Sequence, residues 1–298
     1  MKEGIDVAQQ ITEITRTLSN KIAVVTGASR GAGKGIAIAL GQAGTTVYVT
    51  GRSAANTDSP YGGSVGETAE LVTKSGGEGI PTIVDHADDA AVADLFERIK
   101  QEHGKLDILV NNASKVAGPA TGGFWEKSLE IADLITVGLR SHYVASYYAA
   151  PLMIANGKGL IVNTGHYGAV SYFQNPAYGA QKAGGDKMAA DMAKELRPYN
   201  VAAVSIWMGG LDTERTRAYF ATLPADKIPK QKLESPEFTG RVIAALYNTD
   251  RRMNLSGQAL IGAELGAILG VTDIDGSIPM SNRFTMGGPH ELHRSLID

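Results

Sequence analysis

The chain has 298 residues, of which 43% are hydrophobic and 20% charged, a balance that fits one large globular α/β domain. Its net charge of -3 favours neither nucleic acid nor an anionic membrane surface as a partner. The absence of cysteine excludes disulfides, thiolate metal sites and a cysteine nucleophile. No apolar run approaches the ~18 residues of a bilayer span, so we expect a cytoplasmic protein without a membrane span.

The first 20 residues carry acidic side chains and lack an apolar core, so we expect no secretory signal. Ile11, Ile14 and Leu18 recur at helical spacing. They predict an N-terminal helical extension over residues 1–18 that packs on the domain or on a partner chain. A frayed extension is the alternative.

Short runs of β-branched and other apolar residues alternate with stretches long enough for crossover helices. Seven runs predict strands, at 21–26, 45–50, 79–85, 106–111, 159–164, 201–207 and 258–263. Most are almost continuously apolar, as expected for strands covered on both faces of a parallel sheet. The pattern predicts an α/β fold with a Rossmann-type, doubly wound, seven-stranded parallel sheet and helices on both faces.

The sequence shows no internal repeat and no interdomain linker. We therefore expect one main domain over residues 19–265, followed by a C-terminal tail over 266–298. The polar segment 211–235 follows the sixth predicted strand and is interpreted as a lid. Ser235 and Pro236 then predict the start of a helix, with Ser235 as its N-cap.

The segment 24–44, VVTGASRGAGKGIAIALGQAG, places glycines between a predicted strand and an apolar helix. Gly27, Gly31 and Gly33 lie where a tight turn passes close to a pyrophosphate, and Ser29 lies in the same turn. The helix N-terminus adds oriented N–H donors, so the context predicts a dinucleotide site. The spacing T-G-x-x-x-G-x-G resembles the short-chain dehydrogenase/reductase superfamily.

The residue at the end of the second strand distinguishes the two nicotinamide dinucleotides. An acid there binds the ribose 2′-hydroxyl, whereas an arginine accommodates a 2′-phosphate. This chain has Arg52 in the stretch TGRS, and Arg30 adds a second cation beside Gly31. Because guanidinium groups bind phosphate through charge-assisted contacts, we expect NADP(H) rather than NAD(H).

Tyr178 and Lys182 form a Y-x-x-x-K pair, which lies on one face of a helix. A free tyrosine has a pKa of about 10, and a neighbouring ammonium and a cationic nicotinamide favour its phenolate. Lowering that pKa by about 3 requires roughly 4 kcal/mol. Tyr178 is therefore the expected acid/base toward a substrate oxygen, while a nicotinamide exchanges the hydride.

The glycine turn, the N-N-A triplet at 111–113 and the Y-x-x-x-K pair resemble the superfamily over residues 19–265. The stretch FWEKSLEIADLITVGLRSHYVASYYAAPLM is similar to the vertebrate dehydrogenase/reductase member-one group and its bacterial relatives. The resemblance implies an NADP-binding Rossmann catalytic domain, carbonyl or alcohol substrates, homodimers or homotetramers, and a lysine that holds the nicotinamide ribose. It also implies cofactor contacts by Asp85, His86, Asn112, Gly209, Leu211 and Thr213.

Two positions depart from the superfamily pattern. His166 stands where the pattern has the serine that holds the substrate oxygen, and we expect the imidazole to replace the hydroxyl. A structural role for His166, with Tyr167 or Ser171 assisting, is the alternative. The asparagine of the pattern, which supports a proton-relay water, falls on Gly138.

The sequence thus predicts an NADP(H)-dependent oxidoreductase, a carbonyl reductase or alcohol dehydrogenase acting on a ketone, aldehyde or secondary alcohol. A non-catalytic, redox-sensing NADP(H) module is the alternative, because the usual serine and asparagine are replaced. Enoyl reduction is disfavoured, since those relatives usually space tyrosine and lysine more widely. His290 and His293 lack a third ligand in the sequence, so no metal site is expected.

Overall fold

The computed structural model describes residues 17–115 and 121–291, so the predicted helix over 1–18 lies almost entirely outside the described residues. Within these ranges, seven parallel strands form one sheet in the order β3-β2-β1-β4-β5-β6-β7. The strands are β1 (Ile22–Val25), β2 (Thr46–Gly51), β3 (Glu78–Ile83), β4 (Ile108–Asn111), β5 (Gly159–Gly165), β6 (Val201–Trp207) and β7 (Ala259–Ile261). The predicted fold class is confirmed.

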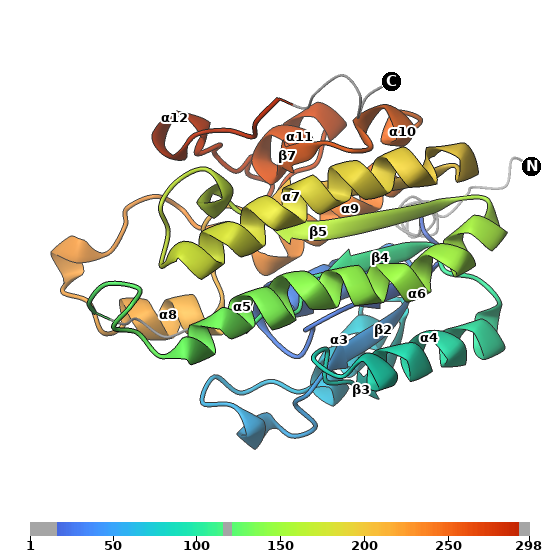
Figure 1. Cartoon of the computed structure of the whole chain (residues 1–298), viewed down its shortest axis with the longest axis horizontal. Coiled ribbons are helices and arrows are strands. Elements are labelled where there is room, and N and C mark those ends of the chain that lie inside the picture. Colours follow the sequence, from blue (N-terminus) through green and yellow to red (C-terminus); the bar gives the residue numbers. More distant parts are fainter. Residues whose placement is uncertain (1–16, 116–120, 292–298) are drawn as a thin grey trace, which may run out of the picture.

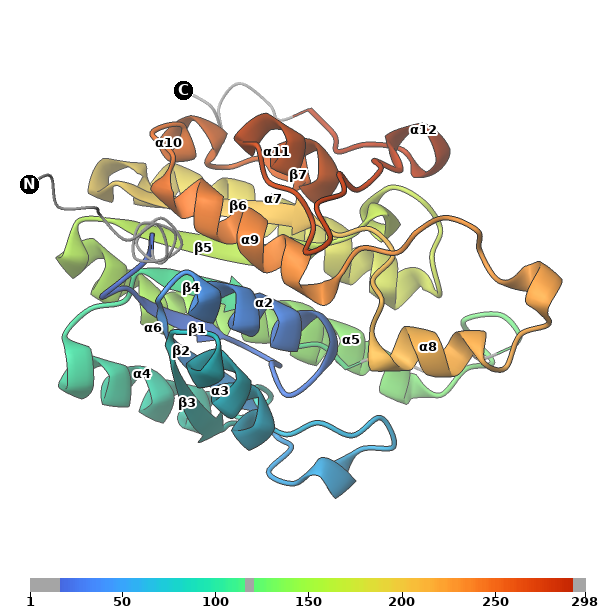
Figure 2. The same ribbon diagram turned by 180° about the vertical axis from the view of Figure 1, so that it is seen from behind.

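Helices cover both faces of the sheet, as Figures 1 and 2 show from opposite sides. One face packs against α2 (Gly31–Gln42), α3 (Val65–Lys74), α9 (Pro236–Asn248) and α11 (Gly262–Leu269). The other packs against α4 (Asp89–His103), α6 (Ser141–Asn156) and α7 (Pro176–Leu196). Shorter helices are α5 (Asp133–Ile135), α8 (Glu214–Phe220), α10 (Arg252–Leu255) and α12 (Arg283–Met286).

Alternation along the strands produces the two cores. In β1, Ala23 and Val25 belong to the core beneath α2 and α9, whereas Ile22 and Val24 belong to the core beneath α4 and α6. All four side chains are buried, because a central parallel strand is covered on both faces. Each valine or isoleucine buried in this way contributes about 1.5–3 kcal/mol.

The strand order reverses between β1 and β4, and such a switch point opens a crevice at the carboxyl ends of the strands. The residues that follow the strands therefore gather at one edge of the sheet. They include Gly27 after β1, Arg52 after β2, Asn112 after β4, His166 after β5 and Met208 after β6. Every predicted site residue lies at this edge, in α2 or α7, or in the segment 211–235.

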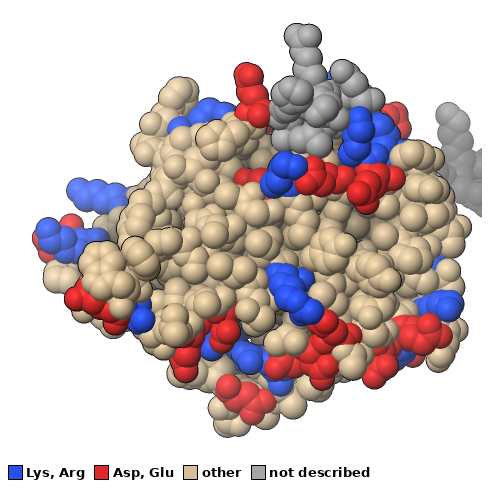
Figure 3. All heavy atoms as spheres, in the orientation of Figure 1, with Lys and Arg blue, Asp and Glu red and all other residues tan. Residues whose placement is uncertain are grey.

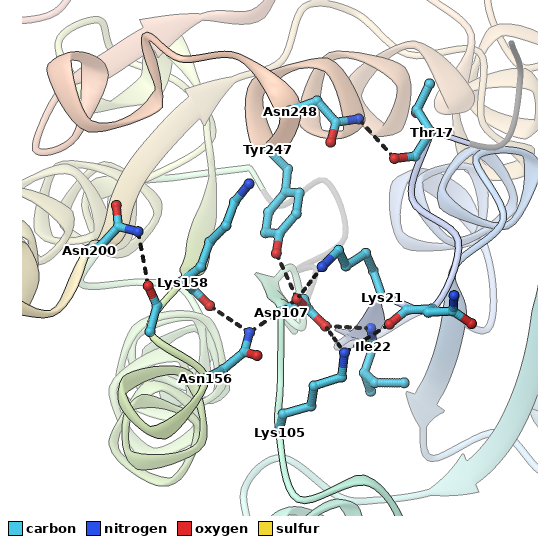
Figure 4. Close-up of polar contacts among 12 residues, drawn as sticks. Thr17, Lys21, Ile22, Lys105, Asp107, Asn156, Lys158, Asn200, Tyr247 and Asn248 are labelled. Carbon is cyan, nitrogen blue, oxygen red and sulfur yellow. Dashed lines mark hydrogen bonds and ion pairs between the residues drawn. The ribbon is translucent and has the colours of Figure 1, made fainter.

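The opposite edge of the sheet is held together by Asp107, which lies just before β4 (Figure 4). Its fully buried carboxylate accepts hydrogen bonds from Ile22 N at 3.0 Å, Tyr247 Oη at 2.7 Å and Asn156 Nδ2 at 3.1 Å. Burial alone raises the pKa of Asp107, but these donors and nearby lysines lower it overall. This cluster joins β1, β4, α6 and α9 far from the site.

Candidate functional site

The turn between β1 and α2 requires glycine for two physical reasons. Gly27 and Gly31 adopt left-handed φ angles of 64° and 57°, which side chains disfavour. A Cβ on Gly33 would lie 2.5 Å from Asn112 Nδ2, and that amide donates to Thr26 O at 2.9 Å. The chain therefore passes close to β4 and leaves the N-terminus of α2 facing the crevice. This cradle fits the pyrophosphate of a dinucleotide.

The two predicted guanidinium groups have different surroundings. Arg52 is 69% exposed in its side chain and forms a long ion pair with Asp85 at 4.0 Å. Arg30 donates from Nε to Gly62 O at 2.6 Å and from Nη2 to Ser53 Oγ at 2.7 Å. Arg30 therefore also anchors the loop after β2 beside the glycine turn, a role that its position in the sequence did not predict.

Ser29 and His86 are buried at the same end of the crevice. The His86 Nε2 lies 2.7 Å from Thr50 Oγ1, and among the described residues its Nδ1 has no hydrogen-bond partner. Burial lowers the pKa of His86 to about 4, so the ring is neutral at pH 7. A buried imidazole nitrogen without a partner fits a polar group of a bound nucleoside.

Tyr178 and Lys182 lie on the first turns of α7, which begins with Asn175 as N-cap and Pro176 at its first position. Lys182 Nζ lies 5.5 Å from the Tyr178 ring centroid and donates to Thr164 O at 2.9 Å. The end of β5 thus fixes the ammonium beside the phenol. Burial lowers the pKa of Lys182 to about 8, which leaves it mostly protonated at pH 7.

Burial raises the pKa of Tyr178 above its ordinary value. This direction is opposite to the one expected from the neighbouring ammonium. The phenol ring is enclosed, and among the described residues the Lys182 ammonium donates to Thr164 O rather than to the Tyr178 hydroxyl. A protonated phenol is the form that donates a proton to a carbonyl oxygen.

His166 lies directly against Tyr178. Their ring centroids are 5.6 Å apart, and the Phe173 ring packs against both, at 4.6 Å from the imidazole and 5.4 Å from the phenol. Gly168 N donates to His166 Nδ1 at 2.9 Å. Burial, with a smaller effect of the Lys182 charge, lowers the pKa of His166 to about 4. The neutral ring therefore carries its proton on Nε2, which is a donor in the manner of a serine hydroxyl.

The other two candidates for the serine position already have partners. Tyr167 is buried and its hydroxyl accepts from Asn282 N at 3.0 Å, while Ser171 Oγ donates to Met286 O. Both partners belong to the segment after α11, which packs on the loops around the site. The predicted domain boundary at residue 265 falls inside α11, so this part of the tail continues the domain.

Gly138 lies in a wide helical turn over Thr136–Arg140 that leads into α6. A Cβ on Gly138 would lie 2.3 Å from Gln181 Nε2. Gln181 is buried, precedes Lys182, and donates from Nε2 to Ser114 Oγ at 3.1 Å. The space beside residue 138 is thus filled by the Gln181 amide. Sequence reasoning missed Gln181 and Ser114, although both adjoin predicted motifs.

The chain leaving β6 is held by Glu234. Gly209 N donates to Glu234 Oε2 at 3.2 Å, and the backbone of Leu211 pairs with that of Glu234. Burial raises the pKa of Glu234 to about 7. Thr213 caps α8, accepting from Thr216 N at 3.2 Å. The two ends of the segment 211–235 therefore meet beside the predicted nicotinamide contacts, and Ser235 is confirmed as the N-cap of α9.

The comparisons with known proteins define the class. The family model for short chain dehydrogenase matches residues 21–224, so the chain belongs to this family of nicotinamide-dependent oxidoreductases. Among the described residues, no helix is long and apolar enough to cross a membrane.

Individual relatives narrow the resemblance. The chain is 38% identical to mouse dehydrogenase/reductase SDR family member 1 over 91% of this chain and 88% of that protein. It is 32% identical to the 3-oxoacyl-(acyl-carrier-protein) reductase FabG of Pseudomonas aeruginosa over 67% of this chain and 78% of that protein. The crystal structure of a short-chain type dehydrogenase/reductase from Mycobacterium marinum shares the fold, with a TM-score of 0.70, 24% identity, and coverage of 84% and 96%. The chain thus resembles the member-one group.

Proposed function

We propose that the protein is an NADP(H)-dependent carbonyl reductase or alcohol dehydrogenase acting on a ketone, aldehyde or secondary alcohol. The observation that carries this proposal is the cluster of Tyr178, Lys182 and His166 at the same edge of the sheet as the glycine turn, with Lys182 Nζ 5.5 Å from the Tyr178 ring centroid. A bound nicotinamide supplies or accepts the hydride. The chain's own residues move the proton and hold the substrate oxygen.

Each of the three side chains has a distinct role. The Tyr178 hydroxyl, kept protonated by burial, donates its proton to the carbonyl oxygen in reduction. The Lys182 ammonium, held on Thr164 O at 2.9 Å, stabilises the phenolate that remains and reaches toward the nicotinamide ribose. His166 donates from Nε2 to the same oxygen, in place of the missing serine. Tyr178 and Lys182 therefore belong to both the catalytic and the cofactor site.

The activity test measures NADPH oxidation against a panel of ketones, aldehydes and quinones. We expect turnover by the wild-type protein and a loss of about 10²–10⁴ in kcat for Tyr178→Phe, because the proton donor is removed. An unchanged Tm of the variant is the control for folding. Tight NADPH binding without turnover of any carbonyl would instead support the redox-sensing module, which the replaced serine and asparagine favour.

The preference for NADP(H) is proposed from Arg52 and Arg30 at the end of the crevice near β2. The exposed Arg52 guanidinium supplies the stronger contact, since Arg30 is partly engaged with Ser53. We expect Arg52→Asp to weaken NADPH binding by about 10–100-fold, because a hydrogen bond to a charged group is worth roughly 1.5–3 kcal/mol. NADH binding should be kept or improved, since an acid at this position can bind the ribose 2′-hydroxyl. Equal affinity of the wild-type protein for both cofactors would contradict the assignment.

Homodimers or homotetramers in the cytoplasm complete the proposal. Residues 141–156, which form α6, contain no charged side chain, and Tyr143 and Tyr147 are exposed on it. Figure 3 shows a broad area with few Lys, Arg, Asp and Glu on this face, although α7 carries the exposed ion pair of Lys187 and Asp191. A face of this kind favours association with a second copy. Analytical ultracentrifugation measures the oligomeric state directly.

A further inference from the structure

A lid carboxylate lies at the phosphate seat. Glu214 opens α8 in the lid segment and is more than 180 residues away in sequence from the glycine turn, yet its Oε2 accepts a hydrogen bond from Gly31 N at 3.0 Å. Its Oε1 lies 3.8 Å from Lys34 Nζ. Figure 2 shows α8 beside the end of α2 at which the chain arrives from β1. Sequence reasoning did not single out this residue.

The contact with Glu214 lies at the N-terminus of α2. The first amides of a helix have no partner within the helix, and the helix dipole favours an anion there. The N-cap of α2, Arg30, makes no side-chain cap, so Gly31 N–H is open to another acceptor. A pyrophosphate and the Glu214 carboxylate therefore compete for the same donor, and their like charges repel at this distance.

Neighbouring contacts hold α8 over the same crevice. The guanidinium carbon of Arg215 lies 4.8 Å from the centroid of the Tyr61 ring, in the loop after β2. At the base of the lid, Asp212 N donates to Glu234 O at 2.9 Å and Glu234 N donates to Gly210 O at 2.8 Å. The base is thus fixed by backbone pairing, whereas Glu214 and Arg215 make side-chain contacts that can be released without unfolding the lid.

We propose that Glu214 is an internal competitor for the cofactor: its carboxylate holds α8 on the phosphate seat, and the dinucleotide pyrophosphate displaces it. The inference rests on the proposed function only in taking a nicotinamide dinucleotide as the ligand. When the cofactor binds, its pyrophosphate replaces the Glu214 carboxylate as the acceptor of Gly31 N–H, and α8 is released. The affinity for the cofactor is therefore lower than it would be without the Glu214 carboxylate.

The binding test compares wild type with Glu214→Ala and Glu214→Gln in cofactor-free protein. We expect Glu214→Ala to lower the Kd of NADPH and of ADP-ribose by about three- to tenfold, with a smaller gain for Glu214→Gln. Adenosine 2′-monophosphate, which has no pyrophosphate, should bind all three proteins equally. Asp226→Ala is the matched control, because it removes the same charge from an exposed part of the same lid segment.

Hydrogen exchange provides a readout that does not depend on the cofactor. We expect faster amide exchange in α8 of Glu214→Ala than in α8 of the wild-type protein, and faster exchange in wild type once ADP-ribose is bound. Unchanged dinucleotide affinity, an equal gain for Asp226→Ala, or an equal gain for adenosine 2′-monophosphate would overturn the proposal. Failure of carbonyl turnover alone would contradict the proposed reaction but not the competition between Glu214 and the pyrophosphate.

Discussion

At the scale of single residues, the unusual feature is a neutral imidazole where a serine is expected. His166 has two nitrogens in different situations: Nδ1 accepts from Gly168 N at 2.9 Å and shapes the turn, which leaves Nε2 to carry the proton and to act as the donor in the proposed mechanism. Its low pKa of about 4 keeps both functions constant throughout the neutral range. A serine hydroxyl would supply the donor without the ring that packs on Phe173 and Tyr178.

The two functions of His166 predict different outcomes for two substitutions. In His166→Asn, Oδ1 can keep the acceptor for Gly168 N while the Nε2–H donor is lost, so we expect a kcat lower by about 10²-fold at nearly unchanged Tm. His166→Ala should lose both activity and stability. Steady-state kinetics and thermal unfolding of the two variants measure the split. A loss of activity below about threefold in both would show that the imidazole has only a structural role.

At the scale of elements, α7 is the organising helix of the catalytic end of the site, because it carries Tyr178 and Lys182 and packs on β5 and β6. Its first turn carries Tyr178, and its next carries Gln181 and Lys182. The Gln181 amide packs on Gly138 so closely that a Cβ there would lie 2.3 Å from Nε2. The Gln181 amide also reaches Ser114 after β4. Helix α7 and the wide turn before α6 therefore pack closely at one position, where only the glycine at 138 leaves room for the Gln181 amide.

This fit predicts a coupling between residues 138 and 181. Gly138→Ala gains helix propensity of up to about 1 kcal/mol but overpacks the Gln181 amide at a cost of roughly 1–3 kcal/mol, so we expect net destabilisation. The double variant Gly138→Ala/Gln181→Ala should recover at least about 1 kcal/mol relative to the sum of the single effects. Urea unfolding of the four proteins completes the cycle, and strict additivity would contradict the packing argument.

At the scale of the whole molecule, three histidines are folded into the interior in their neutral form. Burial lowers the pKa values of His86, His142 and His166 to about 4, 3 and 4. The unfolded chain, with ordinary values near 6.5, therefore binds more protons than the native protein as the pH falls below about 6.5. Glu234, with its pKa raised to about 7, has the opposite effect and cancels about one of these three protons.

The free energy of unfolding is therefore expected to fall as the pH is lowered from about 6.5 to 4.5. The expected slope is roughly 3 kcal/mol per pH unit, because the unfolded chain binds about two more protons than the native protein. Urea unfolding at pH 7, 6 and 5 measures the slope. Replacing one of the three histidines by glutamine should remove about one proton from this difference and so reduce the slope by about 1.4 kcal/mol per pH unit. A free energy that rises toward pH 5 would contradict the burial of neutral imidazoles.

The sequence by itself determined where the seven strands lie along the chain, the glycine turn and the Y-x-x-x-K pair, because these depend on short-range patterns: apolar runs, helical spacing and turns whose backbone conformation favours glycine. Tertiary structure alone decided which side chains meet. It brought Glu214 to Gly31, Gln181 to Gly138 and the segment after α11 onto the loops around the site. Such contacts join residues far apart in the chain, and no local pattern records them. The direction of the Tyr178 pKa was likewise decided by burial, which becomes known only when the layers pack around the ring.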